Sequence, residues 1–199
     1  MRMVYAHMRM NNRKRQQTLS TADWEKAALK LIAEQGVSAL AVEPLSRRLG
    51  VTKGSFYWHY KNRQALLERA LARWERIDTE NVIDRVIKKA TPAERLFALF
   101  ANVAVDRYDG ELYTAFSASR DPLVKAVVDR VNKRRLKFLE DCYRDLGLPT
   151  EEAKNISLIA YSTYLGLIKL RSDTPDAIPG KAQYKEMMKM IVEVLVPQK

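Results

Sequence analysis

Apolar residues recur at the spacing of one helical face along most of this chain. The first such helix is predicted to begin after Ser20, which together with Asp23 has the pattern of a capping box. It is predicted to end at Gly36, since glycine is favoured where a helix stops. Its apolar face would consist of Trp24, Ala27, Ala28, Leu31 and Ile32.

Three further helices are predicted before residue 75. The second is short and ends at Gly50, and the third runs from near Thr52, a possible cap, to about Tyr60. The fourth begins near Asn62 and carries apolar residues at helical spacing as far as Trp74.

Beyond residue 75 the pattern remains helical. Helix starts are predicted at Thr91-Pro92, at Asp121-Pro122 and near Thr150, and a turn is predicted at Asp109-Gly110. A loop over 172–180 precedes a last amphipathic helix over about 181–196. Because no segment alternates with a period of two, the sequence predicts an all-α protein.

The excess of positive charge indicates that the protein binds a negatively charged partner. The formal net charge is +11, and residues 1–75 hold 14 Lys and Arg against 6 Asp and Glu. Such an excess favours a polyanion, nucleic acid before an acidic membrane. Residues 1–18 form a basic segment that is either a solvated tail or an arm that follows DNA.

Cysteine and hydropathy indicate the compartment. Cys142 is the only cysteine, so no intrachain disulfide is possible, and its apolar neighbours suggest a buried structural thiol. No apolar run approaches the ~20 residues that span a bilayer. We therefore expect a cytoplasmic protein with no membrane partner.

The segment 44–60 has the logic of a helix-turn-helix. Ser46 is small enough for the third helix to pack across the second, and Gly50 lies where a sharp turn favours positive φ. Leu45, Leu49, Val51 and Phe56 would form a small core between the two helices, while other side chains of the third helix face a DNA major groove. By itself this spacing fits many helical hairpins.

A longer block is more specific. The run Gly50-Val51-Thr52-Lys53-Gly54-Ser55-Phe56-Tyr57-Trp58-His59-Tyr60-Lys61-Asn62, followed by Arg63-Gln64-Ala65-Leu66-Leu67, resembles the TetR family of transcriptional regulators. The resemblance extends from about Asp23 to Leu71. It implies an N-terminal three-helix helix-turn-helix DNA-binding domain (19–66), a fourth helix as connector (about 62–75) and a C-terminal helical ligand-binding and dimerisation domain (76–199).

The resemblance also implies which residues touch DNA. Two departures from the family pattern lie at the second helix: Ala41 has no hydroxyl for capping, and Glu43 either accepts from a cytosine amino group or is solvated. Phe56 and Tyr60 are expected in the core, whereas Trp58 is either partly buried with a backbone contact or exposed. The candidate DNA-binding residues are Glu43, Arg47, Thr52, Lys53, Gly54, Ser55, Tyr57, Trp58, His59, Lys61 and Arg63.

Two more sites follow from the resemblance, for a homodimer that binds an inverted-repeat operator. A small amphipathic or aromatic ligand would contact some of Phe97, Phe100, Asn102, Tyr108, Tyr113, Phe116, Phe138, Tyr161 and Tyr164. The dimer interface would use Gly166, Met187, Met188, Ile191, Val194 and Leu195, although this apolar stripe could instead pack inside its own subunit.

No pattern of an enzyme is present in the sequence. It has no Gly-rich phosphate loop, nucleophile elbow or HExxH motif, and its two histidines, His7 and His59, have no neighbours at ligand spacing. We therefore expect no catalytic residue, no metal and no cofactor. The basic run 133–137 is expected to be a solvated helix face. The sequence leaves open a DNA-binding dimer without ligand sensing, and a helical enzyme or carrier.

Overall fold

The structure is a computed structural model that describes residues 19–103 and 107–197, without the side chains of 101–103, 107–109 and 181. The predicted basic arm, 1–18, lies outside these residues. The described chain is helical throughout and contains no β-strand. The N-terminal elements are α1 (Thr21–Gln35), η1 (Val37–Ala39), α2 (Val42–Leu49), α3 (Lys53–Tyr57) and α4 (Arg63–Glu75). The C-terminal elements are η2 (Arg76–Glu80), α5 (Asn81–Val86), α6 (Pro92–Val103), α7 (Arg107–Ser117), α8 (Pro122–Asp145), α9 (Thr150–Asp173), η3 (Pro175–Ala177) and α10 (Lys181–Leu195).

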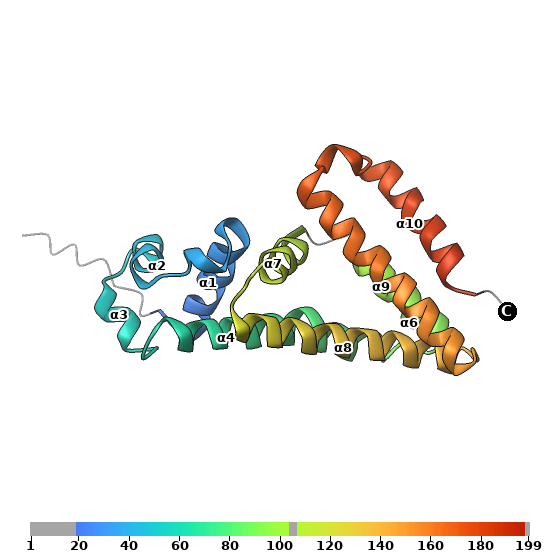
Figure 1. The fold of residues 1–199 in the computed structure, drawn as a ribbon, viewed down its shortest axis with the longest axis horizontal. Coiled ribbons are helices and arrows are strands. Elements are labelled where there is room, and N and C mark those ends of the chain that lie inside the picture. Colours follow the sequence, from blue (N-terminus) through green and yellow to red (C-terminus); the bar gives the residue numbers. More distant parts are fainter. Residues whose placement is uncertain (1–18, 104–106, 198–199) are drawn as a thin grey trace, which may run out of the picture.

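The molecule is elongated, with its two halves joined along α4 and α8 (Figure 1). The small helices α1–α3 lie at one end, and α9 and α10 diverge from each other at the opposite end. Helix α7 lies between the halves, where it packs against both α1 and α9. The N-terminal helices are therefore in direct contact with the C-terminal domain.

Local signals explain most helix ends. The capping box at Ser20 is confirmed, since its hydroxyl accepts from the Asp23 backbone N–H and the Asp23 carboxylate accepts from the Ser20 N–H. Asn62 caps α4 through its bond with the Ala65 N–H. Thr52 precedes α3 but makes no capping bond, and α3 ends at Tyr57, earlier than predicted.

The predicted turn at Asp109-Gly110 is wrong, because both residues lie inside α7. A Cβ atom at Gly110 would lie 3.5 Å from the Ile168 side chain of α9. Gly110 therefore lies inside a helix at the contact of α7 with α9, where a Cβ atom would make an ordinary van der Waals contact. The π-helical turn η2, which separates α4 from α5, was not predicted.

The hydrophobic core has two parts. The first runs from α1 through α4 to α7 and α8, and includes the fully buried Trp24, Phe56, Trp74 and Phe116. The second joins α5, α6, α8, α9 and α10 and includes Cys142, whose pKa burial raises to about 11. Because the first core crosses residue 75, it ties the helix-turn-helix to the C-terminal helices.

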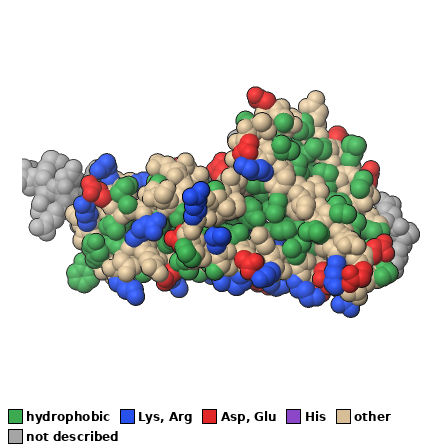
Figure 2. Space-filling model, viewed as in Figure 1, with side chains coloured by type: hydrophobic (Ala, Val, Ile, Leu, Met, Phe, Trp, Pro, Cys, Tyr) green, Lys and Arg blue, Asp and Glu red, His purple; other side chains and the backbone are tan. Residues whose placement is uncertain are grey.

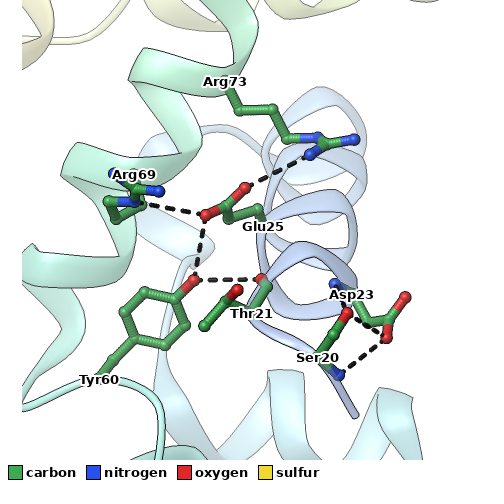
Figure 3. Close-up of polar contacts among 7 residues, drawn as sticks. All are labelled: Ser20, Thr21, Asp23, Glu25, Tyr60, Arg69 and Arg73. Carbon is green, nitrogen blue, oxygen red and sulfur yellow. Dashed lines mark hydrogen bonds and ion pairs between the residues drawn. The ribbon is translucent and has the colours of Figure 1, made fainter.

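One buried carboxylate holds α1 to α4 (Figure 3). Glu25 of α1 is 6 % exposed and lies 3.4 Å from the Arg73 guanidinium and 3.5 Å from that of Arg69. The Tyr60 hydroxyl lies 3.3 Å from the same carboxylate and 3.1 Å from the Thr21 carbonyl oxygen. Burial, and then the charge of Glu25, raise the pKa of Tyr60 to about 12. The phenol therefore stays protonated and remains a hydrogen-bond donor.

We expect Glu25→Gln to destabilise the protein by about 1–3 kcal/mol, because Arg73 would lose its carboxylate partner in a partly buried position. Urea unfolding measures this difference in free energy. Glu68→Gln is the control, since Glu68 is an exposed glutamate of α4 that accepts a bond from Gln64. Equal losses in both variants would show that the buried cluster has no special contribution.

Candidate nucleic-acid interface and ligand cavity

The turn between α2 and α3 depends on Gly50. Its φ of 67° and ψ of 30° are left-handed values that glycine adopts without strain. The following Val51 N–H donates to the Ser46 carbonyl oxygen at 3.0 Å, and Ser46 itself is buried. Leu45 and Phe56 are fully buried beneath the turn. The predicted small core of the helix-turn-helix is therefore present and sets the direction of α3.

Helix α3 exposes the side chains that the resemblance assigns to DNA. Thr52, Lys53 and Gly54 are exposed, and Ser55 is half-buried. Tyr57 is 61 % exposed and Trp58 is 89 % exposed, so of the two alternatives for Trp58 partial burial is wrong. Large exposed aromatic rings are unusual on a protein surface and indicate contact with a partner.

Charged residues link the start of α2 to α3. The Glu43 carboxylate lies 2.8 Å from the Lys53 ammonium and 3.3 Å from the Arg47 guanidinium. The hydrogen bond from Lys53, followed by its charge, lowers the pKa of Glu43. All three side chains are exposed, so the contacts orient Lys53 and Arg47 without removing them from solvent.

Two predicted phosphate-binding residues differ in their surroundings. Lys61 is exposed beside α3. The Arg63 guanidinium instead donates to the carbonyl oxygens of Leu40 and Val37, at 2.5 and 2.9 Å. Arg63 thus holds the η1 turn against α4, and any contact with DNA would have to share these donors.

His59 is half-buried, with its ring centroid 6.3 Å from that of Trp24. Within the described residues no group of three or more His, Cys, Asp or Glu could hold a metal ion. The described helices also include none that is long and apolar enough to cross a membrane.

A cavity of about 610 Å³ opens among the C-terminal helices, within the range of small-molecule sites. Four of the candidate ligand residues line it: Phe100, Phe138, Tyr161 and Tyr164. Its remaining apolar wall is formed mainly by Val82, Ile83, Leu99, Leu139, Leu167 and Ile168.

The other candidate ligand residues lie elsewhere or are not described. Phe116 packs on Trp74, with ring centroids 4.8 Å apart, and Tyr113 donates to Asn132 from the core. These two are core residues that the cavity lining does not include. Phe97 is 46 % exposed and is also absent from the lining. The side chains of Asn102 and Tyr108 lie outside the described residues.

The sequence interpretation missed Arg135, a half-buried arginine in the cavity wall. Its Nε donates to Thr79 Oγ1 at 2.9 Å, its Nη2 donates to the Asp78 carbonyl oxygen at 3.1 Å, and its guanidinium lies 5.8 Å from the Trp74 ring centroid. The run 133–137 was expected to be solvated throughout. However, Arg135 follows Val131 by four residues and precedes Phe138 by three, which places it on the apolar face of α8.

The predicted dimer residues divide between surface and core. Val194 is 76 % exposed and Gly166 is exposed, whereas Met187 and Ile191 are half-buried. Met188 and Leu195 are 7 % and 4 % exposed because they pack in the second core, so part of the stripe packs inside its own subunit. Apolar side chains gather on the surface over α9 and α10 (Figure 2). The largest exposed ones on these helices are Leu158, Ile159, Leu170, Met190 and Val194.

Comparison with known proteins agrees with this geometry. The model of the family described as bacterial regulatory proteins, tetR family, matches residues 26–70. Over 43 residues the chain is 46 % identical to the tetracycline repressor protein class A from transposon 1721 of Escherichia coli, which is 22 % of this chain and 20 % of that repressor. The chain thus matches about a fifth of the length of this curated relative.

Similarity of fold extends over the whole molecule. A TetR transcriptional regulator from Legionella pneumophila superposes with a TM-score of 0.74 at 14 % identity, covering 90 % of this chain and 98 % of that one. AibR in complex with isovaleryl coenzyme A and operator DNA superposes with a TM-score of 0.68 at 20 % identity, covering 90 % and 99 %. The helix-turn-helix therefore matches the TetR family of bacterial regulatory proteins in sequence, and the full helical arrangement is similar in fold to solved TetR-family regulators.

Proposed function

We propose that this chain is a dimeric, sequence-specific DNA-binding regulator, and that a small ligand releases it from its operator as a repressor. The observation that carries the proposal is α3, which follows a glycine turn and exposes Lys53, Tyr57 and Trp58 together. A helix fits the DNA major groove, where lysine reaches guanine or phosphate and an aromatic ring contacts thymine methyl groups or sugars. The crystal structure of AibR holds both operator DNA and isovaleryl coenzyme A, which supports the same two kinds of partner here.

The cavity favours ligand sensing over the alternative of a DNA-binding dimer with a filled C-terminal core. A volume of about 610 Å³ with a largely apolar wall and a few polar groups suits a drug-sized molecule. The helical enzyme or carrier gains no support from the cavity, which lacks a nucleophile beside a base among its described lining residues.

The dimer interface is proposed on the outer faces of α9 and α10. Ile159 and Leu158 of α9, with Met190 and Val194 of α10, are each more than half exposed. Contiguous apolar surface of this kind is typical of subunit interfaces. In such a dimer the two copies of α3 would contact DNA half-sites whose centres lie about one turn of the double helix apart, near 34–36 Å.

The physical link from cavity to DNA is proposed to be η2. This π turn continues α4 directly, and three arginines of α8 bind the last residue of α4 and the turn itself. Arg130 binds Glu75 through two bonds of 2.6 and 2.7 Å, Arg134 binds Glu80 through two of 3.2 Å, and Arg135 binds Thr79. Because Arg135 and Thr79 also line the cavity, a ligand that displaces either side chain would alter the end of α4.

A second link uses α1. Glu34, in its last turn, lines the cavity and forms a two-bond ion pair with Arg48 of α2, at 2.6 and 2.7 Å. A ligand that moved the end of α1 would therefore pull on the helix that supports α3. A ligand shifts DNA affinity only if it binds one of the two arrangements more tightly.

DNA binding is expected to weaken steeply with salt, because each neutralised phosphate contributes about −0.9 to the slope of log K against log salt. Lys61→Ala should reduce the magnitude of that slope by about one unit and weaken binding to all sequences alike. Fluorescence anisotropy with DNA selected from a random pool measures the slope. Lys88→Ala, which removes an exposed lysine after α5, should leave it unchanged. An unaltered slope in Lys61→Ala excludes Lys61 from the phosphate contacts.

The proposed interface predicts that Val194→Asp, or Ile159→Asp, yields a folded monomer, since a charge would enter an apolar contact. Light scattering measures the mass, and circular dichroism checks the helix content. Ile87→Asp is the control, since Ile87 is 50 % exposed but lies outside α9 and α10. Leu195→Asp is unsuitable because Leu195 is buried in its own subunit. Dimers in both test variants would place the interface elsewhere.

If η2 transmits the signal, operator binding should change amide exchange in residues 76–80 by about fivefold or more, the lower end of allosteric couplings. Hydrogen–deuterium exchange with mass spectrometry measures this, with the start of α9 as an internal reference. Thr79→Val removes the acceptor for Arg135 Nε and should abolish the change. If amide exchange in residues 76–80 of the wild-type protein is the same with and without operator DNA, the proposed link is contradicted.

A further inference from the structure

One end of the cavity is formed by α9 and α10, where Arg171 lies against Tyr184. The guanidinium carbon of Arg171 is 5.0 Å from the centroid of the Tyr184 ring, a cation–π contact. No carboxylate among the described residues lies within ion-pair distance of this guanidinium. The nearby carboxylate of Asp173 pairs instead with Lys169, at 2.7 Å. Arg171 therefore brings a positive charge to the cavity wall without a negative partner.

The Tyr184 hydroxyl is also without a partner. Tyr184 is 7 % exposed, and its hydroxyl oxygen is buried with no hydrogen bond to any described residue. A buried hydroxyl of this kind is costly to a folded protein unless something else completes its bonding. Since Tyr184 lines the cavity, a bound molecule would be placed to do so.

Several other polar groups of the wall have partners or are open to solvent. Arg135 donates to Thr79 and to the Asp78 carbonyl oxygen, and the Tyr161 hydroxyl donates to Asn132 at 2.8 Å. Glu34 is paired with Arg48 outside the cavity. Glu111 lies at the wall but is exposed to solvent. In this part of the wall, the Arg171 guanidinium therefore lies beside the Tyr184 hydroxyl with neither an ion-pair partner for the first nor a hydrogen-bond partner for the second among the described residues.

We propose that this cavity binds an amphipathic anion: an apolar chain that ends in a carboxylate or phosphate, with the anionic group held between Arg171 and the Tyr184 hydroxyl. The inference rests on the proposed function in taking the cavity as the ligand site. A guanidinium offers paired N–H donors to such a group, and the phenol adds an O–H donor. The apolar chain lies against Val82, Leu99 and Phe138, which have no polar atoms to satisfy.

The test is displacement of Nile red, an uncharged fluorescent probe, from the full-length protein. Decanoate is expected to displace the probe at a concentration at least about tenfold below that of 1-decanol, because a charge-assisted bond is worth about that factor. Decyl phosphate is the third competitor. If decanoate binds more tightly than decyl phosphate, the ligand is a carboxylate. If decyl phosphate binds more tightly, the ligand is a phosphate. Either result supports the anion site.

Two variants locate the anionic group. Arg171→Met should remove the advantage of decanoate over decanol, and Tyr184→Phe should reduce it severalfold without loss of thermal stability, since the lost hydroxyl has no partner. Lys169→Met is the matched control: it removes a positive charge from the same helix, at an exposed residue that does not line the cavity. It should leave the advantage unchanged.

Equal displacement by decanoate and decanol overturns the proposal, as does an advantage that persists in Arg171→Met. Failure of Nile red to bind overturns it together with ligand sensing. Binding of the unliganded protein to selected DNA is measured separately by anisotropy. If decanoate selectivity holds but DNA binding fails, the anion site stands and the proposed regulator does not.

Discussion

The packing of Trp74 joins the two halves of this molecule. It lies near the end of α4, is 1 % exposed, and contacts Phe116 of α7 on one side and the Arg135 guanidinium of α8 on another. A ring of this size cannot shift without moving its neighbours, because protein interiors are close-packed. The helix that leads from the helix-turn-helix is therefore fixed by residues that line, or adjoin, the cavity among the C-terminal helices.

Charged contacts between the helices accompany this packing and specify how the helices align. Arginines of α8 bind the end of α4 and η2, while Glu25 binds Arg69 and Arg73 inside the N-terminal domain. The partly exposed pairs contribute little to stability individually. Their value is in specifying one register between helices, since a sliding helix would separate several pairs at once.

Much of the fold could be predicted because its signals are local. The capping box at Ser20, the left-handed Gly50 and the proline at the start of α8 each act within a few residues. The local turn signal at Asp109-Gly110 was overridden, since both residues lie inside α7 where it packs on α9. The π turn η2 had no local signal that the sequence analysis used, and its side-chain partners Arg134 and Arg135 lie more than 50 residues away in the chain.

The sequence by itself determined the helical class, the helix-turn-helix and the resemblance to the TetR family, and four of its nine candidate ligand residues line the cavity. Only the tertiary structure decided that Arg135 faces inward, that Arg63 binds backbone carbonyls, and that Leu195 packs in its own subunit. The physical reason is the range of the interactions. Helical periodicity assigns a side chain to a face, whereas the element that covers that face lies tens of residues away in the chain.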